Sequence, residues 1–512
     1  MYEGGLRLIS PRRAAVVQHL RLMERDPDYR ESVLALMRLQ GYKAARKGGN
    51  NTAWLDSGRS ADAEVLGDLP ALRSRARELN RDDAIGSGIS GSFVNNVIGT
   101  GIVPQARTED EETNRRLEAV WAERAPVLDP VDMLSHGQTQ RLVFRKWFED
   151  GEVLRKAAKT GPYEPVWFET IEADRLATPR EKWGNPQFRD GVERDEYGRV
   201  VGYWILKSHP GDAMGAAALR DSEQFVSVGP DVCRHLKIIE RPGQSRGVPA
   251  FHAVLQDLRD LDLLIVACLK RVQIAACLSV FIKTLNPIDD VLDTTAKKYG
   301  YVLDQQITPG MIFKLYPDEE IQTLIPNFPV PELEPFVVML ARRVGAALGV
   351  SWQVVLKDFS KSTYSSARTD LLESRQVYAV FQTAYVSQCL NWEWQTVMDD
   401  AALRGDMRLS GITPEERRAV HWIPNGWKWV DPVKEAAGAQ LELQMGTQTL
   451  RDLCAEKGKD WEEQLRQRLR EELREAELRK EMGLPEKGQA DQGAAARTIA
   501  LLAGARDEES VA

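Results

Sequence analysis

Cysteine and histidine are scarce in this sequence. The 512 residues include five cysteines and six histidines, and no two cysteines form a CxxC pair. Few, widely spaced cysteines are typical of a reducing compartment and argue against a disulfide framework or a thiolate metal site. The histidines show no HExxH-type spacing with one another or with a carboxylate. We therefore expect no metal centre and no bound cofactor.

A secretory signal and an uncharged membrane-spanning run are also missing. Residues 1–10 contain no apolar core of the kind that a signal peptide needs. The most apolar stretch, residues 263–282, has the length of a membrane span, but Lys270 and Arg271 lie at its centre. Each of these charges would cost about 2.5–3.5 kcal/mol at the middle of a bilayer. We interpret the stretch as a helix buried in the protein or between subunits, and we predict no membrane partner.

The chain also lacks an excess of positive charge. It has 68 lysines and arginines against 76 aspartates and glutamates, so its formal net charge is −8. A protein that wraps nucleic acid tightly through phosphate contacts needs a basic surface, which this composition does not provide. The composition does not exclude a protein that handles nucleic acid loosely. The length predicts about three or four folding units.

The periodicity of apolar residues predicts an α+β protein that is predominantly α-helical. Helices are expected at residues 14–47, 84–98, 110–124, 130–150, 251–283, 332–348, 365–404, 414–420, 433–456 and 461–481, with a short one at 289–299. Short strands are expected at residues 152–158, 166–171, 191–195, 200–206, 231–240, 311–315 and 321–325. A further helix is predicted to start with Asp68 as its cap and Pro70 just inside its first turn.

A glycine-rich segment at residues 86–91, GSGISG, matches the G-x-G-x-x-G dinucleotide fingerprint. That fingerprint needs a strand before it and a helix that starts within it. The residues before this segment are helical and polar in character. We therefore favour close packing of helices through small residues over a dinucleotide site.

A second segment at residues 243–247, GQSRG, matches the G-x-S-x-G motif with Ser245 in the nucleophile position. His252 and His421 follow it in the order that a serine hydrolase requires. Prolines on both sides of the motif interrupt the strand–turn–helix geometry of a nucleophile elbow. We favour a polar structural loop and keep a serine hydrolase as the alternative.

Several blocks of sequence, in a fixed order across residues 40–400, carry more information together than any one of them alone. They are Leu72–Arg81, Asn95–Ile102, Trp147–Glu152, Ile171–Leu176, the hairpin Gly191–Trp204, Arg241–Pro249, Leu348–Trp352, Asp358–Ser360 and Tyr364–Arg368. In this order and spacing, the blocks resemble the portal proteins of tailed bacteriophages, specifically the lambda-like branch. The last 100 residues match that family only in general character.

The resemblance implies a structural protein without catalytic residues, not an enzyme. Portal subunits form a ring, typically of twelve copies, at one vertex of the capsid. Double-stranded DNA passes through the ring without sequence preference during packaging and ejection. The expected partners are further copies of the chain, the terminase large subunit, the head–tail connector, and the major capsid and scaffold proteins. The expected location is the portal vertex of the virion, after assembly in the host cytoplasm.

The resemblance also implies a division of the subunit into wing, stem, clip and crown. Laid onto this chain, the wing covers residues 1–250 with a β-containing part at 151–240, the stem helix 251–283, the clip 284–330, the second stem helix 331–349, the tunnel loop 350–364, a long wing helix 365–404 and the crown 405–482. We expect residues 483–512, which are rich in alanine, glycine and charge, to be a disordered tail.

The stem helix is expected to pack against its neighbours around the ring. Its broad apolar face carries Leu261, Leu264, Ile265, Cys268 and Val272. The charged residues on the same helix either face the channel, pair between subunits or form an ordinary solvated face. These residues are Asp257, Arg259, Asp260, Asp262, Lys270 and Arg271.

The tunnel loop is expected to contact DNA at the constriction of the channel. Its residues are Lys357, Asp358, Phe359, Ser360, Lys361 and Ser362. The two lysines offer point charges to phosphate, while Asp358 keeps the local charge low. In the alternative interpretation, one or both lysines form salt bridges between subunits. Another homo-oligomeric scaffold, such as a capsid-associated adaptor, is a further alternative to the portal as a whole.

Overall fold

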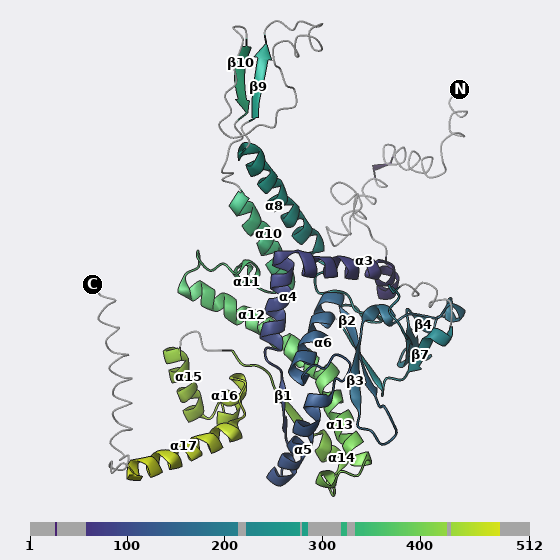
Figure 1. The fold of residues 1–512 in the computed structure, drawn as a ribbon, viewed down its shortest axis with the longest axis vertical. Coiled ribbons are helices and arrows are strands. Elements are labelled where there is room, and N and C mark those ends of the chain that lie inside the picture. Colours follow the sequence, from purple (N-terminus) through teal and green to yellow (C-terminus); the bar gives the residue numbers. More distant parts are fainter. Residues whose placement is uncertain are drawn as a thin grey trace, which may run out of the picture. The chain divides into compact units, whose positions relative to one another are not determined.

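The computed structural model describes residues 26–27, 58–212, 222–276, 279–284, 319–324, 333–427 and 432–481. The chain divides into two units, residues 1–60 and 61–512, and every element named below belongs to the second. The described part of this unit consists mostly of helices, with four small antiparallel sheets (Figure 1). The prediction of a predominantly helical α+β protein is confirmed. The elements predicted at 289–299 and 311–315, most of 14–47, and the tail lie outside the described residues.

Helix α3 (Ala61–Asp82) is longer than the sequence predicts. It runs without a break through Asp68 and Pro70, so the predicted helix start at Asp68 is wrong. Proline inside a helix removes one backbone hydrogen bond, which usually costs about 3 kcal/mol. Ala61 and Leu69, which both precede Pro70, are buried. Tertiary packing of the first turns thus outweighs the local signal for a helix start.

Helix α4 (Ala84–Val97) agrees with the helix predicted at 84–98, and its cap is Asp83, which the sequence analysis did not name. The carboxylate of Asp83 accepts the backbone N–H of Gly86 at 2.5 Å. Gly86 is also a site of close approach, because a Cβ there would lie 3.1 Å from the carbonyl oxygen of Leu79. The G-x-G-x-x-G segment is therefore helix interior, with close packing at its first glycine, and the element directly before it is helix α3, not a strand.

Helices α5 (Glu111–Arg124) and α6 (His136–Asp150) complete the first helical group. The second of these starts six residues later than predicted. Ser135 and Gln138 form a reciprocal capping box there, which satisfies the first backbone N–H groups of α6. The residues that form this cap are a local sequence signal for a helix start. The apolar residues before them led to a predicted helix that begins too early.

A long helical segment returns to this group from later in the chain. It consists of α12 (Tyr364–Tyr385), a π-helical turn (Val386–Leu390) and α13 (Asn391–Leu403). The predicted helix at 365–404 agrees with it closely. The π-helical turn, which the sequence reading did not foresee, inserts one wide turn where the segment meets the sheets.

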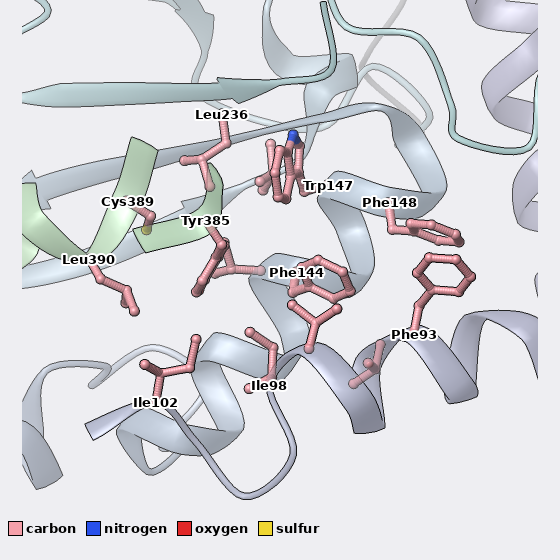
Figure 2. Close-up of a cluster of buried hydrophobic side chains, with 14 of the residues drawn as sticks. Phe93, Ile98, Ile102, Phe144, Trp147, Phe148, Leu236, Tyr385, Cys389 and Leu390 are labelled. Atoms are coloured by element: carbon pink, nitrogen blue, oxygen red, sulfur yellow. The ribbon is translucent and has the colours of Figure 1, made fainter. Parts of the chain in front are cut away.

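Aromatic side chains from α4, α6 and α12 form the centre of the main core. Phe93 stacks on Phe148 with ring centroids 4.5 Å apart, and Phe144 meets Tyr385 edge-on at 6.1 Å (Figure 2). All four rings are almost completely buried. Offset and edge-on pairs of this kind add stability beyond the burial of their area. The core therefore joins segments that are almost 300 residues apart in sequence.

The β-containing part consists of two antiparallel sheets. The first has the order β3-β2-β8, from β2 (Glu152–Ala158), β3 (Trp167–Ile171) and β8 (Cys233–Lys237). The second has the order β4-β5-β6-β7, from β4 (Phe188–Arg189), β5 (Val192–Arg194), β6 (Val200–Leu206) and β7 (Phe225–Val228). The strands predicted at 152–240 are all present, and the two short ones, β4 and β7, were missed.

A two-stranded sheet joins distant parts of the chain. β1 (Val103–Ala106) pairs with β11 (Val420–Ile423), which follows the short helix α14 (Pro414–Arg418). The predicted helix at 414–420 is therefore correct only in its first part. Because β11 is hydrogen-bonded to β1, the residues up to 423 belong to the main body of the subunit.

Helix α8 (Leu255–Ala276) pairs with α10 (Leu333–Leu348), which is followed by the short helix α11 (Trp352–Leu356). The predicted stem helix at 251–283 is too long at both ends. Residues 279–284 form strand β9 (Ser279–Thr284), paired with β10 (Glu319–Leu324). The run SVFIKT is rich in β-branched and aromatic residues, which favour a strand when a partner strand is present.

Three helices end the described chain. They are α15 (Pro432–Met445), α16 (Leu450–Glu456) and α17 (Trp461–Glu481). The single helix predicted at 433–456 is interrupted at Gly446, which has a left-handed φ of 71°. Thr449 then caps α16 with a capping box, so the chain turns between two helices.

The carboxylate of Glu152, at the start of β2, is the centre of a fully buried ion network. Arg246 donates from Nε at 2.9 Å, His235 Nε2 lies 2.8 Å from the other oxygen, and the N–H of Gly247 donates at 2.7 Å. Burial alone would raise the pKa of Glu152, but Arg246 and His235 outweigh it, so this pKa lies well below its usual value. The charge is thus retained inside the protein.

Arg246 extends the network to the loops that lead into the second sheet. Its two Nη atoms donate to the carbonyl oxygens of Ala173, Leu176 and Asp190 at 2.8–2.9 Å. The backbone comes unusually close here, since a Cβ on Gly247 would lie 2.1 Å from the carbonyl oxygen of Gly151. The loop 241–250 is therefore locked onto the start of β2 by charge and by close backbone contact.

We predict that Glu152→Gln lowers the free energy of unfolding by about 3–5 kcal/mol, because it removes the fully buried counter-charge of Arg246 and leaves only the partly exposed carboxylate of Asp190 to pair with it. Chemical denaturation of the purified chain measures this loss. Glu169→Gln is the matched control, because it removes partly exposed ion pairs with Lys156 and Arg175. That control should cost less than about 1 kcal/mol. Equal losses for the two variants would contradict the central role of Glu152.

We also predict a pH dependence that comes from His235. Burial lowers the pKa of His235, and Glu152 opposes this only in part, so the fold favours the neutral ring. Its contribution to stability is present above the unfolded pKa of about 6.5 and is lost as the pH falls below that value. The unfolding midpoint should drop between pH 7 and pH 5, and His235→Gln, which keeps a donor to Glu152, should flatten that drop. Parallel curves for the two proteins would exclude this group as the cause.

Candidate functional site

The helix pair α8 and α10 is the first place to which the sequence reading assigns a role. The two helices lie side by side, and Arg343 Nε is 3.0 Å from Asp257 Oδ2 (Figure 1). Within α8, Asp262 lies 3.4 Å from Arg259. Two of the three aspartates proposed for the channel or for subunit contacts therefore already have an ionic partner in the same chain, and the third, Asp260, accepts a hydrogen bond from Gln256 at 2.8 Å.

The residues predicted for packing between subunits differ in their exposure. Leu261 is buried at 1% exposure and belongs to the subunit's own core. Ile265 is 39% exposed, and Leu264, Cys268 and Val272 are half-buried. The four residues beyond Leu261 are therefore accessible to a partner, whereas Leu261 fixes α8 to its own chain.

The accessible side of this pair carries more apolar residues than the sequence reading named. Leu263, Ile265, Val266 and Leu269 on α8 and Phe336 and Met339 on α10 are each 37–56% exposed. On each helix most of them are three or four residues apart and therefore lie on one face, with Leu263 and Ile265 at the two edges of that face on α8. The sequence already indicated this exposed apolar surface, because a helix that is apolar on nearly all sides is normally buried against a partner. We call these six residues the stem face.

The loop between α11 and α12, residues 357–363, is the second predicted place. Lys357 ends α11 in the left-handed conformation, with φ 55°, and its exposed side chain passes beside Gly88 of α4. The carboxylate of Asp358 accepts the backbone N–H of Ser360 at 2.9 Å, and hydrogen bonds from Ser360 lower its pKa. These contacts give the loop a defined turn.

Lys361 forms an ion pair with Glu334, at the start of α10. Gln353 Nε2 donates weakly to the hydroxyl of Ser362 at 3.4 Å, and Phe359 is 38% exposed. The six predicted loop residues therefore lie together at one turn, next to the end of α10 that begins the stem pair. The two lysines differ, because Lys361 has a counter-charge within its own chain.

Ser245, the candidate nucleophile, is fully buried. Its hydroxyl donates to one oxygen of Asp62 at 2.7 Å, and its backbone N–H donates to the other at 2.7 Å. His252 contacts the carbonyl of Pro249 at 2.9 Å instead, and His421 lies in β11, which pairs with β1. Within the described residues, no histidine is bonded to Ser245, so the motif forms a structural loop and no catalytic triad.

One group of potential metal ligands comes together from separate segments. Glu172, Asp174 and His209 each place one ligand atom within 4.8 Å of the others. Arg77 already pairs with Asp174 at 2.5 Å, and the N–H of Gly211 donates to His209 Nδ1 at 3.0 Å. These contacts favour an ion-pair network over a metal site.

Helix α8 contains much of the most apolar stretch of the sequence, so we ask whether it could span a membrane. Among the helices described, none combines the length and the hydropathy that a bilayer crossing requires. Lys270 and Arg271, at the centre of the apolar stretch, are exposed.

Comparison with known proteins places this fold in a family. Residues 47–382, about two thirds of the chain, match the model of the phage portal protein family, lambda type. A probable portal protein of Halomonas phage phiHAP-1 is 27% identical over 452 residues, which cover 82% of this chain and 83% of the relative. Portal protein B of Escherichia phage lambda is 21% identical over 503 residues, 86% of this chain and 91% of the relative.

Solved structures with a similar chain come from gene transfer agent particles. A chain in the neck of an empty particle is 12% identical with a TM-score of 0.44, covering 74% of this chain and 89% of that chain. A chain in the neck of a native particle is also 12% identical, with a TM-score of 0.41, covering 75% and 90%. The family match over most of the chain decides the classification: this chain belongs to the lambda family of phage portal proteins.

Proposed function

We propose that copies of this chain form a closed ring at one vertex of a phage capsid, through which double-stranded DNA enters and leaves. Membership of the portal family supports the proposal. The observation that carries it is the stem face, six apolar residues that the chain itself leaves 37–56% exposed. A head-to-tail contact around a ring buries such a face once in every subunit.

The number of subunits and the partners follow from family resemblance. We expect twelve copies, which contact the terminase large subunit during packaging and the head–tail connector afterwards. The major capsid and scaffold proteins surround the ring in the assembling head. Contacts with DNA go to the backbone alone, because packaging must accept any sequence. The role is structural, and the buried Ser245 gives no support to the hydrolase alternative.

The domain assignment can be refined with the element boundaries. The wing covers 61–250 and α12 to β11, the stem is α8 with α10, and β9 with β10 is the described part of the clip. The tunnel loop narrows to residues 357–363. We assign the start of the crown to α15, and the pairing of β11 with β1 of the proposed wing supports this assignment.

Replacing an apolar residue of the stem face with a charge should disrupt the ring. We predict that Leu269→Glu weakens subunit association at least tenfold, about 1.4 kcal/mol per contact, because a charge would be buried between subunits. Mass photometry and negative-stain imaging show the ring and its dissociation. Leu403→Glu is the matched control, since Leu403 is 85% exposed on α13, outside the stem face. A wild-type chain that remains monomeric would overturn the proposed function.

Neutralising the loop lysines should impair DNA packaging or retention without preventing ring formation. We predict a larger loss for Lys357→Ala than for Lys361→Ala, because Lys361 is already paired with Glu334. DNA protected from nuclease in assembled heads, measured against salt concentration, gives the effect. Glu334→Gln is the control, since it frees Lys361 and should not reduce retention. Unchanged packaging and retention in the double lysine variant would refute a role of these lysines at the DNA.

A further inference from the structure

The chain turns back sharply where helix α10 ends, a few residues before the tunnel loop. Gly349 has a left-handed φ of 69°, and the backbone N–H of Val350 donates to the carbonyl oxygen of Gly345 at 2.9 Å. A left-handed glycine followed by a hydrogen bond of this span is a Schellman motif, which ends many helices. The motif frequently brings together apolar side chains at the two bonded positions. Here one of these positions is Gly345, which has no side chain, so the turn packs differently.

The backbone after the turn occupies the space that a side chain at residue 345 needs. A Cβ on Gly345 would lie 2.5 Å from the carbonyl oxygen of Val350 and 3.2 Å from the backbone nitrogen of Trp352. Close carbon–oxygen contacts are about 3.3 Å or longer, so the carbonyl would have to move by about 0.8 Å. Glycine inside a helix is less stable than alanine. The close approach of the backbone therefore accounts for a glycine at this position.

From this turn the chain runs back along α10 to the tunnel loop. We call residues 350–361 the return segment. Its ties to α10 follow one another in antiparallel order, and they are Val350 with Gly345, Trp352 with Arg342, and Lys361 with Glu334. In the second tie, the guanidinium carbon lies 5.8 Å from the centre of the indole ring. The last tie is at the first turn of α10, about 16 Å along the helix from the first.

The two outer ties differ in strength. The ion pair of Lys361 with Glu334 joins side chains that are 64% and 65% exposed, and exposed pairs contribute little. The contact at Gly345 is buried and joins backbone to backbone, so neither side can rotate away. A displacement at this turn tilts the return segment, and the far end moves most. The place of the tunnel loop relative to the stem is therefore determined mainly at Gly345.

We propose that Gly345 is a positioning residue for the tunnel loop, because it lets the return segment lie directly on α10 and so fixes Lys357 and Lys361. This inference rests on the proposed function, since the position of the lysines matters only where they meet DNA. The residue lies outside the loop, on the second stem helix. The same helix carries Phe336 and Met339 of the stem face, so one element both packs towards the next subunit and holds the loop.

Hydrogen exchange in the purified full-length chain tests the positioning directly. Gly345→Ala should speed exchange at least tenfold at the amides of Val350 and Asp358, whose hydrogen bonds lie within the turn and the return segment. Gly67→Ala is the matched control, because Gly67 lies inside α3 and a Cβ there meets nothing within 4 Å. The control should leave both rates within twofold of the wild-type values. A folded Gly345→Ala chain with wild-type exchange at Val350 overturns the inference.

A second variant loosens the return segment without adding an atom to the turn. The side chain of Arg342 is exposed, and Arg342→Gln removes its contact with the Trp352 ring. Exchange at residues 352–358 should rise about two- to fivefold, the usual contribution of an exposed cation–π contact. If Gly345→Ala does not fold, this variant decides, and an unchanged rate in it overturns the inference.

DNA retention in assembled heads connects the position of the loop with its role. Gly345→Ala should reduce nuclease-protected DNA to the level of the double variant Lys357→Ala with Lys361→Ala. Added to that double variant, Gly345→Ala should cause no further loss, because it acts through the same two lysines. A further loss would show that Gly345 acts on another part of the ring, and it would overturn the inference.

The outcomes separate this inference from the proposed function. A double lysine variant that retains DNA like the wild type refutes the role of the loop at the DNA, whereas the exchange rates still decide whether Gly345 positions the loop. A wild-type chain that forms no ring overturns the proposed function. The exchange experiment needs only the single chain, so a wild-type rate in Gly345→Ala overturns the positioning even when rings form and package DNA.

Discussion

The buried carboxylate of Glu152 is the contact on which the described body of the subunit depends. It neutralises Arg246, and Arg246 in turn bonds the carbonyl groups that position the loops of the second sheet. Each of four blocks that carry the resemblance to portal proteins contributes to this network. They are Leu72–Arg81 through Arg73, Trp147–Glu152, Ile171–Leu176, and Arg241–Pro249 through Arg246. The blocks are distant in sequence and form one structural unit, which gives their joint occurrence a physical reason.

Other polar groups also form hydrogen bonds and ion pairs inside the protein, among them groups that look reactive in the sequence. The hydroxyl of Ser245 is held by Asp62, and the carboxylate of Glu393 joins Arg155 at 2.7 Å to His136 at 3.0 Å. Burial raises the pKa of the Cys389 thiol well above its usual value, so it remains protonated. What this body offers to the outside is therefore shape and apolar surface, as suits a protein that works by assembly.

Local sequence patterns predicted most of the helices and strands. The predictions failed where contacts between distant segments determine the structure. The strands around Glu152 and the helix returning at 365–404 were readable because their apolar periods are regular. The pairing of β1 with β11 was not readable, because each is a four-residue strand whose partner lies more than 300 residues away. The two loop lysines were found from resemblance, but the pairing of Lys361 with Glu334 depends on how α10 meets the loop. The leucines of α8 and α17 were visible in the sequence as a regular spacing, but only the structure shows that the described part of the subunit leaves them exposed.

The charges of the chain suit a conduit that lets DNA slide. In the proposed ring of twelve copies, two unpaired lysines in each loop could neutralise up to 24 phosphates, and each would add about 0.9 to the slope of log affinity against log salt. Such a ring would grip the DNA. In this chain Lys361 already forms an ion pair with Glu334, so a phosphate that approaches this lysine must compete with a carboxylate. The net charge of −8 per subunit adds a repulsive background. A lysine that exchanges between a carboxylate and a phosphate, both weakly bound, does so faster than it would leave a single strongly bound phosphate. A DNA duplex that slides through the channel requires such fast exchange.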